Sequence, residues 1–533
     1  ARSLNEELIE LRFDEAVPAG KGQLKLAFHG KVNDKDTYGL FRQKSGDDWY
    51  AFTQFEAKGA RQAFPNFDEP GYKVPWTLSL IVPQNLQAVA NTPVLHTIAL
   101  ANGRKRVAFK TTEPLPSYLL AFGVGAFDVI EAGELTGLSK GKKLRFITPK
   151  GQGDRVRFAA SVTAPLVAKL EEYFGMAYPY EKLDMMVLPI SVGFGAMENA
   201  GLITFRSSLM LAKPDEETED FKRDYVAIAA HELAHQWFGN DVTMAWWDDL
   251  WLNESFASWM GDKITDQFMP QWQWSRTVSD ARAHAMRSDR LSSARRVRNP
   301  VLTEDALESA FDGITYAKGQ TLLTMFENWL GQESFRAGVQ RYLKQHAFGN
   351  ATTQDFLTAI AGNDQGILQA FRSFIDQGGI PRLSAKIVCD AQQPQPRLQL
   401  TQSRYRPLGE SAQSHSLWTI PVTISTQYGQ TRRLVSKAFE EVPLVGSVCP
   451  SWVQAKVGGI AYYLVAYEEG VLFNQMTQAK LSVDEVLNGL IDARMLSASG
   501  DLGQDEAMRL AEHFSQHSDQ MVQITALGNL LQS

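Results

Sequence analysis

Cysteine and long apolar runs are what this chain has least of. Cys389 and Cys449 are its only cysteines, so one disulfide and two free thiols are both open, and they do not define the redox compartment. No apolar stretch approaches the roughly 18 residues that a membrane span needs, which excludes a membrane-spanning helix. Residues 1–16 alternate in the manner of a strand and contain neither an initiator Met nor the apolar region of a signal peptide.

Clustered basic charge is also scarce. The net charge of −7 gives no reason to expect nucleic acid or an anionic membrane as a partner. ARRVR at 294–298 is the only dense basic cluster, and we expect a solvated loop there. The chain contains no internal repeat and no low-complexity tract. What remains is 44% hydrophobic and 21% charged, as in an ordinary soluble globular protein, and its length suggests about three or four domains.

The period of the apolar residues divides the chain into four regions. Residues 1–142 show short alternating runs, such as QLKLAFHGKV and WTLSLIVP, which predict an all-β domain that we expect to be incomplete. Residues 143–380 contain long helical stretches, beginning with VRFAASVTAPLVAKLEEYFG. Strands return over 381–467, which fits a small β-sandwich, and 468–533 is a helical segment that we expect to be truncated. The predicted fold class is multidomain α+β.

The strongest chemical signal is HELAHQWFGNDVTMAWWDDLWLNE at 231–254. His231 and His235 stand four residues apart in a run that predicts a helix closed by Gly239. Four residues are about one helical turn, so both imidazoles project from one face and can bind one cation. With nine histidines in the chain, the number of chance HExxH matches is on the order of 0.01. The motif therefore indicates a metal site.

Glu254 completes a set of three donors. Eighteen residues separate it from His235, and it stands in the first turn of what we predict to be a second helix. Two imidazoles and a carboxylate form a zinc site, with one Zn²⁺ per chain, whose fourth position stays open for water. That is the arrangement of catalytic zinc rather than of structural zinc.

The residues around this site predict its chemistry. Metal binding lowers the pKa of water from about 15.7 to about 7, and Glu232 is placed to take that proton and hand it to a leaving amine. The imidazole N–H groups need hydrogen-bond acceptors. Asp248, Asp249 and Asn253 are the candidates.

A second constellation is GAMEN, which comprises Gly195, Ala196, Met197, Glu198 and Asn199. Glycines within and around it let the backbone turn sharply or approach a ligand closely. Its place upstream of the histidine helix suits a strand at a substrate edge that presents Glu198 beside the metal.

Together these motifs resemble the aminopeptidase N family of zinc metallopeptidases, the gluzincin aminopeptidases with HExxH-x18-E and GAMEN. TQFEAKGARQAFPNFDEP (53–70) and DGITYAKG (312–319) resemble further segments of that family, and GIAYYLVAY (459–467) does so more loosely. The agreement runs in the same order from about residue 24 to residue 470. The resemblance implies an N-terminal β-saddle domain, a thermolysin-like catalytic α/β domain at 143–380, the β-sandwich and the start of a C-terminal helical domain.

The resemblance also implies roles for single residues. Glu198 and Glu56 would bind the free α-amino group of the substrate, which favours a charged N-terminus over an internal peptide. Tyr316 would donate a hydrogen bond to the oxyanion. The remaining implied substrate contacts are Gln54 and Phe194 in the pocket for the first side chain, Met197 beside them, and the backbone of Gly195 and Ala196.

We therefore expect a zinc-dependent aminopeptidase that hydrolyses the N-terminal residue from peptides with a free N-terminus. One alternative is an epoxide hydrolase of the leukotriene-processing branch, which would carry GGMEN where this chain has GAMEN. The other is a non-catalytic or weakly active truncated family member that acts as a peptide-binding protein. The sequence leaves open a cytoplasmic, periplasmic or secreted location, the preferred first residue and the oligomeric state, for which a monomer is the default expectation.

Overall fold

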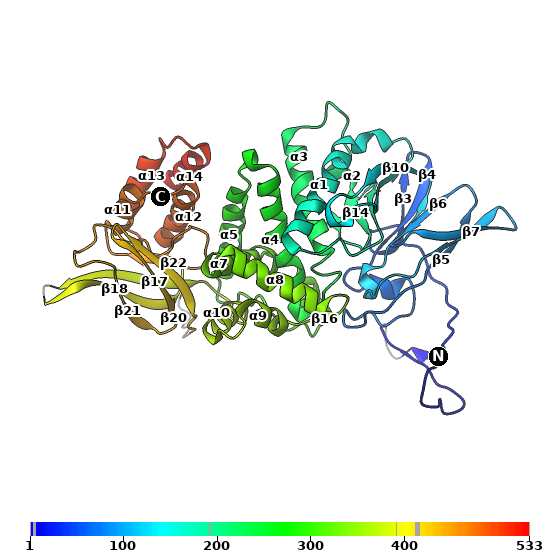
Figure 1. The fold of residues 1–533 in the computed structure, drawn as a ribbon, viewed down its shortest axis with the longest axis horizontal. Helices are drawn as coiled ribbons and strands as arrows, with labels where there is room; N and C mark the ends of the chain where they lie inside the picture. The colour runs from blue at the N-terminus through cyan, green and yellow to red at the C-terminus, as the bar shows by residue number, and fades with distance from the viewer. Residues whose placement is uncertain (1, 4–6, 191–192, 391, 411–415, 532–533) are drawn as a thin grey trace. The chain divides into compact units, whose positions relative to one another are not determined.

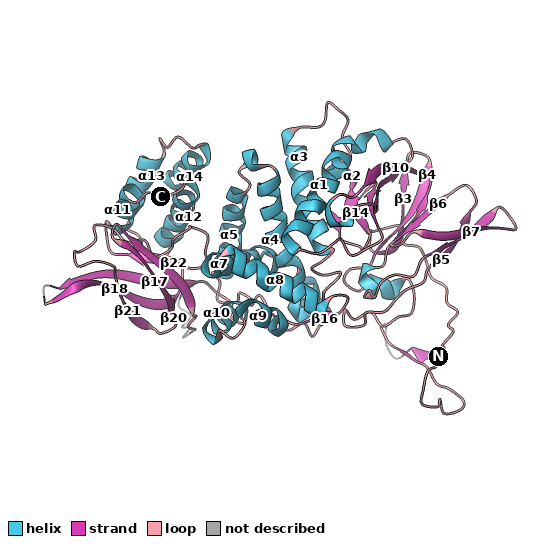
Figure 2. Cartoon of the chain, in the orientation of Figure 1, coloured by secondary structure: helices cyan, strands magenta, loops and turns pink. Residues whose placement is uncertain are grey.

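The computed structural model describes all residues except 1, 4–6, 191–192, 391, 411–415 and 532–533. Its backbone contacts divide the chain into two units. Unit 1 comprises Ala1–Ala164 and Tyr178–Tyr225, and unit 2 comprises Pro165–Ala177 and Val226–Ser533. Strands predominate in the N-terminal region, helices in the middle of the chain, and strands followed by helices in the C-terminal region (Figures 1 and 2). The predicted mixed α+β class is confirmed, while the four domain boundaries stay predictions.

Unit 1 consists mainly of sheets. A four-stranded sheet has the order β3-β4-β9-β6, a three-stranded sheet β5-β8-β7, and a five-stranded sheet β10-β11-β12-β14-β13. The strands are β1 Arg2–Ser3, β2 Ile9–Glu10, β3 Gly39–Ser45, β4 Asp48–Gln54, β5 Ser79–Pro83, β6 Gln87–Ala90, β7 Val94–Leu100, β8 Arg104–Phe109, β9 Phe122–Gly125, β10 Phe127–Glu134, β11 Lys143–Pro149, β12 Lys182–Leu188, β13 Ala196–Met197 and β14 Leu202–Arg206.

The five-stranded sheet positions the GAMEN segment. Its strand β12 is buried at every position, as a strand covered on both faces should be. Met197 on β13 pairs with Thr204 on β14, so β13 is the edge strand and Glu198 follows it directly. The expectation of a strand at an edge is confirmed. Strand β10, which the sequence pattern grouped with the N-terminal domain, pairs with β11 in this same sheet.

One predicted strand is wrong. QLKLAFHGKV at 23–32 alternates as a strand should, but this segment is irregular and exposed at every position. An alternating pattern becomes a strand only when a neighbouring edge and a core face are available. Within the described residues, 23–32 pairs with no strand and packs into no core.

Unit 2 contains most of the helices, and α1 and α3 each belong partly to both units. The helices are α1 Arg157–Phe174, α2 Ser207–Met210, α3 Glu219–His235, α4 Trp251–Phe268, α5 Ser275–Asp289, α6 Glu304–Glu308, the π-helical turn η7 Ile314–Lys318, α7 Gly319–Leu330, α8 Gln332–His346, α9 Thr353–Ala361, α10 Gln365–Ile375, α11 Val471–Gln478, α12 Val483–Ala498, α13 Gln504–Phe514 and α14 Gln520–Leu530. The single-turn 3₁₀ helices are η1 Gly59–Gln62, η2 Ser117–Leu119, η3 Gly137–Ser139, η4 Gly153–Val156, η5 Trp247–Asp249 and η6 Pro270–Trp272.

The strands of unit 2 lie mainly between α10 and α11. They form a four-stranded sheet of order β21-β18-β17-β22 and a two-stranded sheet β19-β20, with a further short pair, β15 and β16, among the helices. Their bounds are β15 Thr243–Met244, β16 Asn350–Ala351, β17 Pro381–Asp390, β18 Gln393–Arg404, β19 Ile420–Thr426, β20 Gly429–Val435, β21 Phe439–Pro443 and β22 Leu464–Tyr467.

A buried aromatic cluster fixes the end of α3 against α4. Phe238 stacks on Phe256 of α4 with ring centroids 4.2 Å apart, and Phe256 meets Phe356 of α9 edge-on at 4.7 Å. Such pairs contribute about 0.5–1.5 kcal/mol each beyond their area of burial. Gly261 on α4 lets the two helices approach, because a Cβ there would lie 3.0 Å from the backbone nitrogen of His231. The two helices that carry the HExxH motif and Glu254 are therefore in rigid contact.

Buried ion pairs centred on Asp492 join α5, α12 and the segment between β21 and β22. Arg282 of α5 donates to Asp492 of α12 at 2.9 Å, and Lys456 also pairs with Asp492. Removing one member of such a group leaves an uncompensated buried charge, which typically costs about 3–5 kcal/mol. Of the helices in the described part of the chain, none is long and apolar enough to cross a membrane.

The two cysteines, whose state the sequence left open, form a disulfide. Cys389 at the end of β17 is bonded to Cys449, which lies 60 residues further along the chain. The bond therefore closes a loop around β18 to β21.

We expect the Cys389→Ser/Cys449→Ser variant to lose up to about 4 kcal/mol of local stability, because the loop regains its freedom when unfolded. Hydrogen exchange of peptides from β17 and β18 measures this loss. A reducing agent should accelerate exchange in the wild type and leave the variant unchanged. Equal exchange in the two proteins would contradict the prediction.

Candidate metal centre

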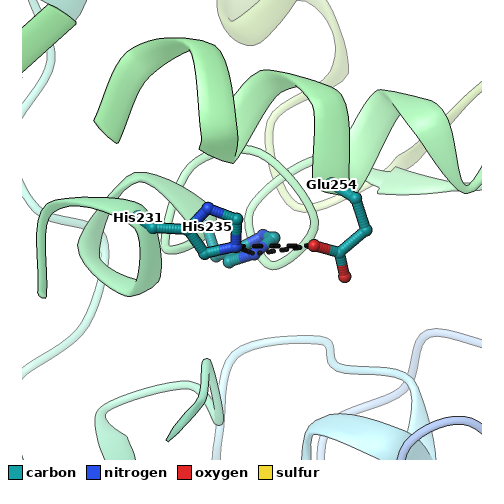
Figure 3. A group of neighbouring side chains, drawn as sticks. All are labelled: His231, His235 and Glu254. Atoms are coloured by element: carbon teal, nitrogen blue, oxygen red, sulfur yellow. Dashed lines mark hydrogen bonds and ion pairs between the residues drawn. The ribbon is translucent and has the colours of Figure 1, made fainter. Parts of the chain in front are cut away.

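Helices α3 and α4 bring three donor atoms together (Figure 3). The Nε2 atoms of His231 and His235 lie 3.0 Å apart, and each is 3.5 Å from Oε2 of Glu254. Donors held at about 2.0–2.1 Å around a tetrahedral zinc ion lie about 3.3–3.4 Å from one another. The three atoms therefore fit one face of a zinc tetrahedron and leave one vertex to a further ligand.

The hydrogen-bond partners of His235 determine which of its two ring nitrogens carries the proton. Its Nδ1 lies 2.6 Å from Oδ1 of Asn253 and 3.1 Å from the carbonyl of Phe238. Both are acceptors, so Nδ1 carries the proton and Nε2 directs its lone pair toward the other donors. The Nδ2 of Asn253 donates to Oε1 of Glu254 at 3.3 Å, which orients the amide. Asn253 thus holds two of the three expected ligands.

Gly239 makes this arrangement possible. Its φ is +110°, in the region that favours glycine, and a Cβ there would lie 1.9 Å from Oδ1 of Asn253. Helix α3 itself ends at His235, slightly earlier than the sequence suggested. A side chain at position 239 would displace Asn253 from His235.

Glu254 is held in its charged form. Burial raises its pKa, but the neighbouring imidazoles of His235 and His231 outweigh that effect and lower the pKa to about 2. A carboxylate that stays ionised is a donor that Zn²⁺ accepts, and a bound cation would stabilise this charge in place of protonated imidazoles. The residues present therefore fit the metal that the sequence predicted.

Two further predicted residues lie at this centre. A carboxylate oxygen of Glu232 is within 4.8 Å of a ring nitrogen of His235. The ring of Tyr316, on η7, is stacked 6.4 Å from the ring of His231. Both side chains therefore lie beside the donors without belonging to the set of three.

The other two candidates for orienting the histidines have different partners. Asp249 accepts from Arg298 at 2.8 Å and from the hydroxyl of Thr353 at 2.6 Å. Asp248 accepts the backbone N–H of Val301 at 2.6 Å. Through these hydrogen bonds, Asp248 and Asp249 attach the segment before α4 to the surrounding chain.

In unit 1, the two predicted amine-binding carboxylates lie together. Carboxylate oxygens of Glu56 and Glu198 approach within 4.8 Å of one another, and Glu198 is 3% exposed. Gln54 ends β4 and is also buried, and no described residue donates a hydrogen bond to its Oε1. Phe194 packs on the core cluster that contains Phe41, and the carbonyl of Gly195 accepts from Arg206 at 2.8 Å.

Sequence reasoning missed the side chains that hold the turn of Tyr316. The expectation of a solvated loop at ARRVR is wrong for Arg295, whose guanidinium donates to the Thr315 hydroxyl at 2.6 Å and pairs with Asp312. Ser255 donates to the Thr315 carbonyl at 2.6 Å. The adjacency of Ser255 to Glu254 was the only signal available in the sequence.

A three-donor site with one free vertex, flanked by a carboxylate and a tyrosine, is typical of mononuclear metallohydrolases. Comparison with known proteins gives the particular family. Residues 158–377 match the peptidase family M1 domain and residues 2–119 match the peptidase M1 N-terminal domain. The chain belongs to peptidase family M1, the family of aminopeptidase N.

Curated relatives agree over most of the chain. It is 34% identical to Aminopeptidase M1 of Arabidopsis thaliana over 87% of its length, and 33% identical to Tricorn protease-interacting factor F2 of Thermoplasma volcanium over 93%. It is 32% identical to Glutamyl aminopeptidase of Bitis rhinoceros over 96% of its length. The chain spans 54%, 60% and 54% of these three relatives, respectively.

We expect Asn253→Ala to weaken zinc binding by about 10–100-fold, because His235 loses the acceptor that orients it. Titration against a competing chelator measures the affinity. Asn529→Ala is the matched control, since its half-buried amide donates to the carbonyl of Leu490 instead. An unchanged zinc affinity in Asn253→Ala would show that the amide does not support the ligand.

Proposed function

We propose that this protein is a zinc-dependent aminopeptidase that binds one Zn²⁺ per chain through His231, His235 and Glu254. The observation that carries the proposal is the spacing of their donor atoms, 3.0 to 3.5 Å, which suits one tetrahedral ion. A structural zinc site would fill the fourth vertex with another protein ligand. The names of the relatives as aminopeptidases point in the same direction.

When bound, zinc would supply a Lewis acid that polarises the scissile carbonyl and acidifies water. Glu232 takes the proton from the attacking water and passes it to the leaving amine, as general base and then as general acid. Tyr316 donates its hydroxyl to the oxyanion that develops on the carbonyl oxygen. The positions of Glu232 and Tyr316 beside the imidazoles support these roles.

The substrate's free amine is held by Glu198 and Glu56. Two carboxylates within 4.8 Å of one another repel, and an ammonium group between them relieves that repulsion. An acetylated or internal peptide nitrogen carries no charge, so the pair selects a free N-terminus. Gln54, Met197 and Phe194 would line the pocket for the first side chain.

The peptide chain itself would extend along β13. An edge strand offers the backbone groups of its open side to an added strand. Ala196 lies on this strand, and Gly195, whose carbonyl already accepts the N–H of Arg206, directly precedes it. The substrates are thus peptides with a free N-terminus. We further propose that residues 1–142 form the saddle-shaped β domain of the family and residues 143–380 its thermolysin-like catalytic domain.

The central test is hydrolysis of an aminoacyl anilide. We expect a chelator to abolish turnover and zinc to restore it, and Glu232→Ala to bind zinc normally while kcat falls by about 10²–10⁴-fold. Glu308→Ala, an exposed glutamate on α6, is the control. If the zinc-loaded wild type binds peptides without hydrolysing them, the alternative of a peptide-binding protein replaces this proposal.

Removing one of the two carboxylates that bind the substrate's amine should mainly weaken substrate recognition. We expect Glu198→Ala to raise KM for free peptides and to reduce the preference for free over N-acetylated peptides, because half of the negative charge that binds the ammonium is lost. Steady-state kinetics on both peptides measures the preference. Glu181→Ala removes an exposed carboxylate paired with Lys110 and serves as the control. If the wild type cleaved acetylated and free peptides at equal rates, Glu198 and Glu56 would not bind the free amine.

A further inference from the structure

Ser255 joins the helix of Glu254 to the turn of Tyr316. It follows Glu254 in the first turn of α4 and is fully buried. Its hydroxyl donates to the carbonyl of Thr315 at 2.6 Å, and Thr315 precedes Tyr316 on η7. One hydrogen bond therefore connects the neighbour of an expected metal ligand with the neighbour of the expected oxyanion donor.

The π-helical geometry of η7 explains why the Thr315 carbonyl is available. In an α-helix, the N–H of Gly319 would bond to the carbonyl four residues earlier, which is that of Thr315. In this turn the N–H of Gly319 bonds instead to the carbonyls of Ile314, five residues earlier, and of Tyr316, three residues earlier. Such single π turns occur frequently at functional sites. The regular partner of the Thr315 carbonyl is thus replaced by the Ser255 hydroxyl.

Gly319 provides the space for this contact. A Cβ at position 319 would lie 1.9 Å from Oγ and 2.7 Å from Cβ of Ser255. The backbone of Gly319 is ordinary helix, with φ −58° and ψ −46°, so another residue could adopt it. The glycine is required by the close approach of Ser255 and not by its backbone angles.

Other residues hold the remaining parts of η7 in place. Arg295 donates to the Thr315 hydroxyl, and Asp312 accepts the N–H of Ile314 at 2.9 Å. At the far end of the turn, Lys318 is buried and donates to Asp289 of α5 at 2.7 Å. These contacts hold the shape of η7, and Ser255 sets its position relative to α4.

We propose that Ser255 is a positioning residue that sets the Tyr316 hydroxyl relative to the donor atoms of His231, His235 and Glu254. The inference rests on the proposed function for its effect on rate. Its structural part, a clamp between α4 and η7, stands on the contacts alone. Ser255 acts through Tyr316 and touches no substrate.

The clamp is tested first by hydrogen exchange in the metal-free protein, which needs no activity. Ser255→Ala should accelerate exchange in a peptide covering 314–320 about tenfold, with α8 unchanged. Thr265→Val is the matched control, because its hydroxyl, also buried on α4, bonds within that helix to Gly261 at 2.7 Å. Unchanged exchange over 314–320 in Ser255→Ala would overturn the proposal.

Gly319→Ala gives an independent test, because its expected effect on hydrogen exchange changes direction with the residue at position 255. Alanine is the better helix former, so this substitution should slow exchange over 314–320 once Ser255 is replaced by glycine. With Ser255 in place, the same substitution should speed exchange, because its Cβ meets the serine hydroxyl. If Gly319→Ala changed the exchange rate in the same direction in both backgrounds, Ser255 and Gly319 would not be in contact.

Kinetics then tests the role of the clamp. Ser255→Ala should lower kcat about tenfold to a hundredfold, with KM and zinc stoichiometry kept. Tyr316→Phe should lower kcat about 10²–10³-fold. In the Tyr316→Phe background, Ser255→Ala should cause little further loss, because the group that it positions is gone.

The outcomes separate the two proposals. Multiplicative losses in the double variant, or a loss of zinc in Ser255→Ala, would overturn the positioning role. A wild type that binds zinc but hydrolyses no aminoacyl anilide would remove the proposed function, while the exchange measurements would still decide whether the clamp exists. A proportional loss of kcat in Thr265→Val would also count against the proposal, because any buried hydroxyl of α4 would then have the same effect.

Discussion

The structure depends on holding three polar donor atoms within 3.5 Å of one another in a buried place. Two imidazoles and a carboxylate lose hydration there, and such a loss is tolerated only when each group is bound and oriented by others. The packing of α3 against α4 supplies that orientation. Ligands that are held in this way need less ordering when a metal binds, so in the proposed zinc site more of the coordination free energy would appear as affinity. The aromatic cluster below the two helices serves the same end, because a shift between them would separate the histidines from Glu254.

Helix α4 is the hub of this arrangement, and three consecutive residues show why. Successive side chains on a helix point about 100° apart, so Asn253, Glu254 and Ser255 address three different neighbours. Asn253 orients His235, Glu254 completes the donor set, and Ser255 reaches the turn of Tyr316. Glycines without a Cβ permit three close approaches around α4: Gly239 opposite Asn253, Gly261 opposite His231 and Gly319 opposite Ser255. A change at any of these glycines therefore acts on the centre, although none of them carries a functional group.

The sequence allowed local features to be predicted and left the contacts between distant segments open. The histidine pair, the helix that bears it and the position of Glu254 follow from helical spacing, which depends only on neighbours along the chain. The choice of Asn253 over Asp248 and Asp249 required the direction in which α4 starts, and that direction is set by packing. The predicted strand at 23–32 failed for a related reason, since alternation specifies a face but not the presence of a partner strand. The sequence predicted a solvated Arg295, because only the fold brings its partners Asp312 and Thr315 to it.

The proposed reaction draws on different physical principles in the two units. In unit 1, carboxylate oxygens of Glu56 and Glu198 lie within 4.8 Å of one another, and in the proposed reaction they bind the ammonium group of the substrate. In unit 2, the ionised Glu254 lies beside two imidazoles, and in the proposed reaction Glu232 transfers a proton and Tyr316 stabilises an anion. The first residue of a peptide with a free N-terminus carries both a cation and, beyond its α-carbon, the carbonyl that becomes an oxyanion. In this proposal, exopeptidase specificity requires no closed end to a cleft. It follows from one set of residues that selects positive charge and another that stabilises developing negative charge.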